Sequence, residues 1–279
     1  MSTILNALSA PTQYINVNGT NYAYRRFGKP SYIPLVGFQH FTGTLDNWDP
    51  VILDGLAQER EILIFDNAGV GNSTGETPDN VADMAHDAVD FLKALGITKI
   101  DVLGFSLGGF IAQYLADKYA DLIRKIIIVG AAPQGVKVLE GFNNLIGKAM
   151  QKDPAERFLY IFFTATDASR AKGKETLQRL FTRTEDRDRE TAQESILAQM
   201  TAITRWGSDP VTIDLKTIQH PVLIVQGSND EMMDSDNSYS LFKQLPNALL
   251  SYYPDSAHGS FYQYPEVFVS EANHFLKTF

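Results

Sequence analysis

The stretch Lys99–Gly109 reads KIDVLGFSLGG, and its character changes halfway along. Its first half is apolar and contains β-branched residues, which predicts a buried strand, while the second half opens a helical pattern that continues to Tyr119. Between them, residues 104–108 follow the pattern G-x-S-x-G. This pattern also occurs by chance in ordinary glycine-rich turns, but a strand followed at once by a helix is the setting that a nucleophilic serine requires. Ser106 is therefore the candidate nucleophile.

Further buried strands are predicted on both sides of this stretch, with helical segments between them. Val81–Leu95, for example, carries apolar residues at three- and four-residue spacing, which is typical of a helix that buries one face. Strands that alternate with helices favour a mostly parallel sheet covered by helices on both faces. The other predicted strands of this kind are Pro34–Gln39, Glu61–Asp66, Lys125–Gly130, Pro221–Gln226 and Leu249–Tyr253.

The N-terminal part of the chain follows a different pattern. Thr12–Asn18 and Asn21–Phe27 are joined around Asn18-Gly19, and an Asn-Gly pair between two strand-like runs predicts an antiparallel hairpin. With this hairpin, the sequence predicts an α/β fold whose mostly parallel central sheet has about eight strands.

Between Ala132 and Asp209 the strand pattern gives way to a helical one. We expect residues 132–209 to form a helical cap inserted in an α/β core, which residues 1–131 and 210–279 make together. The charged run Thr184–Glu190 within the cap is predicted to be the solvent-facing side of a helix. Most aromatic side chains of the cap are expected to pack, and those on its inner face to line a substrate pocket.

The composition excludes several classes of protein. A net charge of −9 and a pI near 5.0 argue against a nucleic-acid binder, which needs a basic surface. The longest apolar runs, such as Ile126–Ala132, are too short to cross a membrane. The chain has no cysteine, and neither a phosphate-binding loop nor metal-ligand spacing of its histidines, so we expect no metal and no cofactor. Because Met1–Pro11 does not resemble a signal peptide, we expect a cytoplasmic protein. As its partner we expect a small apolar molecule.

A serine nucleophile needs a base that an acid orients, and the chain offers five histidines as candidates. His86 and His274 lie inside predicted helices, and His220 begins a strand at the sheet edge away from the nucleophile. His40 follows a strand and lies near the correct edge. His258 lies in a loop between the last strand and the last helix, beside a glycine, and is the candidate base.

The acid is expected at the end of an intermediate strand. Val222–Gln226 leads through a short turn to Asp230, which brings this side chain to the carboxyl edge of the sheet. Asp234 and Asp236 are competitors, but they are expected to begin the next helix, Asn237–Leu245, whose N-terminus favours a carboxylate. Ser, Asp and His then follow one another in an order that serine hydrolases use.

These motifs resemble the α/β-hydrolase superfamily, and within it the capped serine esterases and the perhydrolase-like, non-haem haloperoxidase-like enzymes. The resemblance runs from about Thr12 to the C-terminus, although the cap matches only in position and helical character. It implies that Ser106, Asp230 and His258 are the nucleophile, the acid and the base, and the family's G-x-x-D pattern selects Asp230. The family's terminal pattern matches His258-Gly259, Pro265 and Phe275-Leu276.

The resemblance also implies an oxyanion hole, which stabilises the charge that develops on the attacked carbonyl. One donor would be the backbone N–H of Leu107, directly after the nucleophile. The other would be Phe41, in a loop where Gln39-His40 replaces the family's His-Gly; a shift of one residue would make it Thr42. In the family's D-x-R-G-x-G-x-S segment, Ala68 replaces the arginine, which is expected to alter loop anchoring or pocket polarity.

For the activity, the resemblance implies ester hydrolysis through an acyl-enzyme, on a small or medium substrate with an apolar part. His40, Phe142, Phe162 and Trp206 are the candidate substrate-binding residues. The same triad also serves perhydrolysis, carbon–carbon bond hydrolysis and hydroxynitrile lyases, and some plant hormone receptors retain such a pocket only to bind a ligand. Ser106 counts against haloalkane dehalogenases and typical epoxide hydrolases, because their nucleophile is an aspartate.

Overall fold

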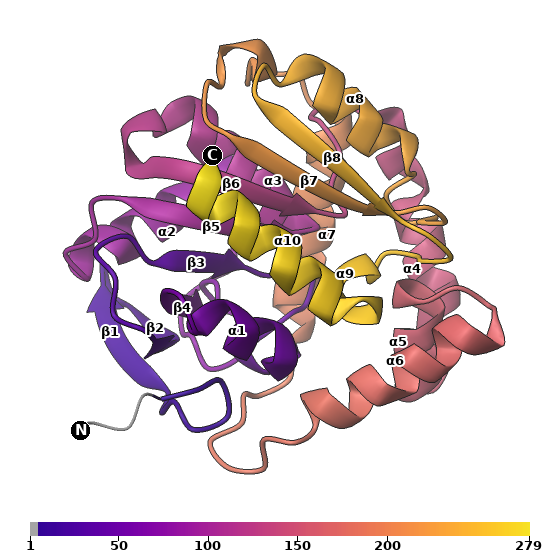
Figure 1. Ribbon diagram of the computed structural model, residues 1–279, viewed down its shortest axis with the longest axis horizontal. Coiled ribbons are helices and arrows are strands. Elements are labelled where there is room, and N and C mark those ends of the chain that lie inside the picture. Colours follow the sequence, from indigo (N-terminus) through magenta and orange to yellow (C-terminus); the bar gives the residue numbers. More distant parts are fainter. Residues whose placement is uncertain (1–4) are drawn as a thin grey trace.

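The computed structural model describes residues 5–279, and its centre is one eight-stranded sheet (Figure 1). β2 lies between β1 and β4 and is antiparallel to both, while the other neighbouring pairs are parallel. The predicted α/β fold with an antiparallel N-terminal hairpin is therefore confirmed. In sheet order the strands are β1 (Gln13–Val17), β2 (Thr20–Gly28), β4 (Glu61–Phe65), β3 (Leu35–Phe38), β5 (Ile100–Phe105), β6 (Ile123–Val129), β7 (Val222–Gly227) and β8 (Ala248–Tyr253).

The hairpin forms at the predicted Asn-Gly pair. Val17 of β1 pairs with Thr20 of β2, so the loop consists of Asn18 and Gly19 alone. Both residues have positive φ, at 53° and 92°, as in the type I′ turn that matches the twist of paired strands. Local turn chemistry thus starts the sheet at one of its edges.

Helices cover both faces of the sheet. Neighbouring residues of a strand point to opposite faces, so in β4 Leu63 packs into one hydrophobic core and Ile64 into the other. In Figure 1, α10 crosses the front of the sheet and α1 lies beside it. One core includes α2 (Val81–Ala94), α3 (Leu107–Lys118) and α8 (Asp236–Gln244), and the other includes α1 (Pro50–Ala57), α9 (Ser260–Gln263) and α10 (Pro265–Thr278).

Residues 132–209, called the cap segment below, join β6 to β7 and are mainly helical. In Figure 1, α4, α5 and α6 lie together at one side of the sheet. None of the helices within residues 5–279 is both long and apolar enough to cross a membrane. The cap helices are η3 (Lys137–Gly141), α4 (Phe142–Met150), α5 (Pro154–Phe162), α6 (Asp167–Leu180) and α7 (Gln193–Ser208); short 3-10 turns elsewhere are η1 (Leu45–Asn47), η2 (Ala120–Leu122) and η4 (Leu215–Thr217).

The charged run Thr184–Glu190 was predicted to be the solvent-facing side of a helix. Most of its residues are exposed, but the run is not helical, so the prediction of a helix was wrong. The run is the non-helical connection between α6 and α7. The Asp188 N–H donates to Asp46 at 2.9 Å, and the Asp188 carboxylate accepts the Asp46 N–H at 3.1 Å. The buried guanidinium of Arg25 donates to the Asp186 carbonyl at 2.8 Å and pairs with Asp46 at 2.7 Å. These partners lie more than a hundred residues away, so local charge patterning does not reveal them.

Candidate active site

The turn between β5 and α3 holds Ser106 in a conformation that few residues other than glycine adopt. Its φ is 55° and its ψ is −114°, and its side chain makes no capping hydrogen bond to α3. A Cβ at Gly104 would lie 2.4 Å from the Gly108 carbonyl oxygen, and one at Gly108 would lie 2.0 Å from the Phe38 carbonyl oxygen. Only glycines allow this close approach, so the two glycines shape a turn that presents the serine at the N-terminus of α3.

His258 and Asp230 form a buried pair across the loops that follow β8 and β7. The His258 Nδ1 lies 2.8 Å from Asp230 Oδ2, and both side chains are almost completely shielded from solvent. The other Asp230 oxygen accepts the backbone N–H groups of Met232 and Met233, each at 2.9 Å, and Oδ2 also accepts from Gln226 at 3.0 Å. A carboxylate surrounded by donors requires a proton on Nδ1, which makes Nε2 the basic nitrogen.

The imidazole of His258 lies at the same edge of the sheet as Ser106, next to Gly130. Among the described residues, Nε2 of His258 is buried and has no hydrogen-bond partner. The imidazole packs against Gly130, where a Cβ would lie only 3.1 Å from two ring atoms. Val129, the preceding residue, accepts the Ser106 N–H at 2.9 Å. The predicted nucleophile, acid and base therefore gather at one small region of the carboxyl edge.

The loop after β3, residues 39–44, leaves the N–H group of Phe41 free at this edge. Within residues 5–279, the backbone N–H groups of Phe41 and Leu107 have no acceptor. Both remain available to bind a developing oxyanion, whereas the N–H of Thr42 is already used. The other N–H groups of residues 40–44 donate as follows: His40 to Gln39 Oε1 at 2.9 Å, Thr42 to Gln199 Oε1 at 2.7 Å, Gly43 to the His40 carbonyl at 2.9 Å and Thr44 to Asn47 Oδ1 at 2.8 Å.

Two of the four predicted substrate-binding residues border this site from the cap segment. Phe162 stacks on the His258 ring, with centroids 5.9 Å apart and planes 20° apart. Phe142 meets the edge of Phe41 at 5.4 Å. The cap segment thus places aromatic surface against both the candidate base and the candidate oxyanion donor.

The other two predicted substrate-binding residues, Trp206 and His40, are packed more deeply. Trp206 stacks on Phe110 of α3 at 5.0 Å and donates its indole N–H to the Ala132 carbonyl at 3.1 Å. These contacts are those of a packing residue, and its binding of substrate stays a prediction. His40 is buried against Phe105 and Phe162, with its Nδ1 2.7 Å from the Phe41 carbonyl oxygen.

Burial of His40 makes the stability of the fold depend on pH. Desolvation lowers its pKa from 6.5 to about 4, the hydrogen bond to Phe41 opposes this shift, and the nearby His258 adds to it. In the unfolded chain the imidazole takes up a proton near pH 6.5, whereas in the folded protein it stays neutral down to about pH 4. The stability that neutral His40 contributes is therefore complete above pH 6.5 and is lost as the pH falls towards 4.

From this linkage we expect the free energy of unfolding to fall by about 2 kcal/mol more between pH 7 and pH 5 in the wild type than in His40→Phe. The variant keeps an aromatic ring against Phe105 and Phe162 but removes the titrating group. Urea unfolding of both proteins at the two pH values measures the difference. An identical pH dependence in both proteins would show that His40 does not titrate in this way.

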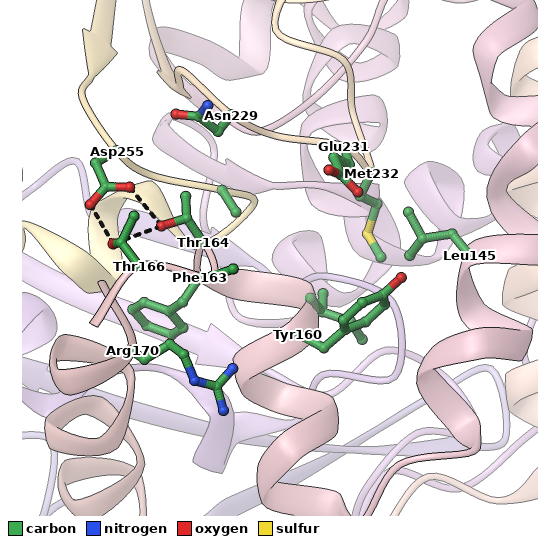
Figure 2. Close-up of a pocket in the computed structure, with 13 residues that line it drawn as sticks. Leu145, Tyr160, Phe163, Thr164, Thr166, Arg170, Asn229, Glu231, Met232 and Asp255 are labelled. Carbon is green, nitrogen blue, oxygen red and sulfur yellow. Dashed lines mark hydrogen bonds between the residues drawn. The ribbon is translucent and has the colours of Figure 1, made fainter. Parts of the chain in front are cut away.

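A cavity of about 340 Å³ lies between the cap segment and the loops that carry the acid and the base (Figure 2). Asn229 and Glu231 flank Asp230 in the chain, and Ala257 precedes His258, although the lining includes neither the acid, the base nor Ser106. None of the four predicted substrate-binding residues lines it. Its apolar lining consists of Leu145, Tyr160, Ile161, Phe163, Ala165, Met232 and Ala257, and its polar lining of Thr164, Thr166, Arg170, Asn229, Glu231 and Asp255.

One wall of this cavity is held in place by hydrogen bonds between the cap segment and the loop before His258. Figure 2 shows the hydroxyls of Thr164 and Thr166 pointing towards the Asp255 carboxylate, to which each donates at 2.6 Å. These two hydrogen bonds hold the pKa of Asp255 below its usual value. Sequence patterns did not reveal this wall, because of the whole cavity lining only Tyr160 and Phe163 belong to the aromatic residues of the cap segment.

Comparison with known proteins agrees with the fold. The family model described as alpha/beta hydrolase fold matches residues 34–265, so the chain belongs to the α/β-hydrolase family, as predicted. A solved structure of an alpha/beta hydrolase fold protein from Chitinophaga pinensis is 63% identical and has a TM-score of 0.98, over 99% of this chain and 100% of that one.

Curated relatives are more distant. A non-heme chloroperoxidase from Streptomyces lividans is 25% identical over 279 residues, which cover 94% of this chain and 98% of the relative. A 2-hydroxymuconate semialdehyde hydrolase from Pseudomonas putida is 25% identical over 225 residues, covering 79% and 78%. The chloroperoxidase agrees with the predicted similarity to the non-haem haloperoxidase-like group.

Proposed function

We propose that this protein is a serine hydrolase that cleaves small to medium carboxylic esters through an acyl-enzyme. The observation that carries the proposal is the buried His258–Asp230 pair, whose unpartnered Nε2 lies at the same sheet edge as Ser106. A histidine oriented by a carboxylate and a serine on a strand-to-helix turn together suit nucleophilic acyl transfer. Hydrolase-named relatives support an enzyme of this class.

In the proposed reaction, Ser106 Oγ attacks the ester carbonyl while His258 Nε2 takes up the hydroxyl proton. Asp230 holds the imidazole and stabilises its positive charge. The Phe41 and Leu107 N–H groups donate to the oxyanion, and the N-terminus of α3 favours the negative charge. The alcohol leaves with the proton from His258, and a water molecule that His258 deprotonates then releases the acid and restores Ser106.

The cavity next to the loops that carry the acid and the base supports a substrate that has an apolar part and no carboxylate. Its volume of about 340 Å³ is near the lower end of the range for small-molecule sites. Leu145, Tyr160 and Met232 supply apolar surface. Arg170, the cation of its wall, is already paired with Glu156 at 2.7 Å, so a substrate carboxylate would compete with an existing ion pair. We therefore propose that the apolar acyl or alcohol group lies in this cavity.

A labelling experiment tests the proposal. We expect a fluorophosphonate to bind covalently at one equivalent and to abolish hydrolysis of p-nitrophenyl acetate, butyrate and octanoate in parallel. Trypsin should release the label on the peptide Ile100–Lys118, in which Ser106 is the only serine. Mass spectrometry of that peptide locates the label. Labelling at another residue, or full hydrolysis by the labelled protein, would contradict the assignment of Ser106.

The relatives favour two alternative reactions on the same residues. The chloroperoxidase relative favours a reaction in which hydrogen peroxide replaces water in attacking the acyl-enzyme. The second relative is named for a substrate without an ester, so its hydrolysis favours carbon–carbon bond cleavage. Peroxide added to the ester assay would divert the acyl group to a peracid in the first case. A folded protein with no ester turnover but with hydrolysis of a vinylogous diketone would favour the second.

A further inference from the structure

We propose that Gln199, on α7 of the cap segment, is a positioning residue for acyl transfer at Ser106. It holds the oxyanion loop, residues 39–44, in the conformation that leaves the Phe41 N–H free for the substrate oxyanion. The inference rests on the proposed function above. It makes a side chain of the cap segment, rather than of the α/β core, responsible for the geometry of the oxyanion hole.

The first support is backbone strain at Thr42. Its φ of 63° lies in the left-handed region, which a β-branched residue rarely adopts. Such a conformation persists only where the surroundings hold it. The cap segment holds both sides of this residue: Gln199 Oε1 accepts the Thr42 N–H at 2.7 Å, and Thr191 Oγ1 donates to the Thr42 carbonyl at 2.8 Å.

The second support is the position of this strain in the loop. The Thr42 N–H belongs to the peptide unit next to the one that carries the Phe41 N–H. If Gln199 released Thr42, its φ would relax and the adjoining peptide units would rotate. The Phe41 N–H would then turn away from its present direction. An oxyanion donor contributes fully only when its direction is fixed before the reaction, so even a small rotation weakens it.

The third support is the burial of Gln199. Its side chain is fully buried, and its oxygen must face the Thr42 N–H, so the other amide atom is identified as Nε2. Within the described chain, this Nε2 has no hydrogen-bond partner. A buried donor without an acceptor is unfavourable, and an apolar side chain would avoid that cost. Holding the loop explains why a residue with an acceptor oxygen occupies this site.

A neighbour on the same helix provides a matched control. Ser195 lies one turn before Gln199, on the same buried face of α7, and donates to the Gly69 carbonyl at 2.6 Å. It therefore joins the cap segment to the core as Gln199 does, but its hydrogen bond goes to Gly69 and not to residues 39–44. A general loosening of α7 would affect both positions, whereas loss of the oxyanion geometry would affect Gln199 alone.

The experiment compares Gln199→Leu with Ser195→Ala and the wild type on p-nitrophenyl butyrate. We expect Gln199→Leu to lower kcat by about 10- to 100-fold, less than the loss of a whole oxyanion donor, with KM within about threefold. A trifluoromethyl ketone, which forms a tetrahedral adduct with an oxyanion, should bind more weakly by a similar factor. Ser195→Ala should keep kcat within about threefold, and Tm values confirm that each variant is folded.

Two results would overturn the proposal. One is equal loss of kcat in Gln199→Leu and Ser195→Ala, and the other is a Gln199→Leu protein with wild-type kcat and inhibitor binding. Should Gln199→Leu not fold, Thr191→Val removes the other contact to Thr42 and must lower kcat in the same direction. Ser106→Ala distinguishes failure of the proposed function from failure of the role of Gln199. If Ser106→Ala is inactive while Gln199→Leu is normal, the hydrolase function stands and only the role of Gln199 is lost.

Discussion

Ser106→Ala is expected to lower kcat for ester hydrolysis by about 10⁴- to 10⁶-fold, because no other group can form the acyl-enzyme. The fold should remain intact. The Ser106 side chain makes no capping hydrogen bond to α3, and alanine meets the same backbone strain at φ 55° as serine does. Steady-state hydrolysis of p-nitrophenyl butyrate, together with urea unfolding, measures both effects.

The control for this variant is Ser228→Ala, at an exposed serine in the loop after β7 that donates only to its neighbour Asn229. It should hydrolyse esters at the wild-type rate. Retention of more than about a hundredth of the wild-type kcat by folded Ser106→Ala would exclude acyl transfer through this serine.

Asp230→Asn is expected to cause the second largest loss, about 10⁴-fold in kcat with little change in KM. Each of the four groups that contact the Asp230 carboxylate is a donor when His258 carries its proton on Nδ1. An asparagine amide would bring its NH₂ against donors on either side. The way to restore a hydrogen bond with His258 is to move the imidazole proton to Nε2, which then cannot accept the serine proton.

Proton NMR and kinetics together test this tautomer change. The downfield signal of the His258 Nδ1 proton should disappear in Asp230→Asn while the protein remains folded. Asp234→Asn is the matched control, since Asp234 is exposed and its carboxylate accepts the N–H of Asp236, the first residue of α8, at 3.0 Å. A large loss in Asp234→Asn together with normal activity in Asp230→Asn would reverse the assignment of the acid.

The parts of the fold that sequence predicts correctly depend on local patterns. The strand and helix around Ser106, the Asn18-Gly19 hairpin and the helices flanking the sheet follow from periodicity and turn chemistry within short windows. His258 and Asp230 could be found because each follows a strand that ends at the same sheet edge. The shared edge of a parallel sheet and the chain order were therefore enough to bring these side chains together.

The parts that sequence does not predict depend on contacts between distant segments. Gln199 meets Thr42 across 157 positions of the chain, and without that contact a choice between Phe41 and Thr42 as the oxyanion donor stayed open. The run around Asp188 carried the charge pattern of a solvent-exposed helix, yet its partner is Asp46 in the core. The lining of the cavity likewise combines side chains from α4, α5 and the loops after β7 and β8, and no single window contains them.

The connection between α6 and α7 bears on how this enzyme could be engineered or diversified. Exchanging caps between related hydrolases is an attractive way to change specificity, and it assumes that a cap is a cassette with two cut points. Here the cap segment depends on the core at more than its two ends, because Arg25 and Asp46 in the core bind the middle of that connection. A transplanted cap would need a recipient that supplies both residues, so productive chimaeras should be confined to donors and recipients that share this pair.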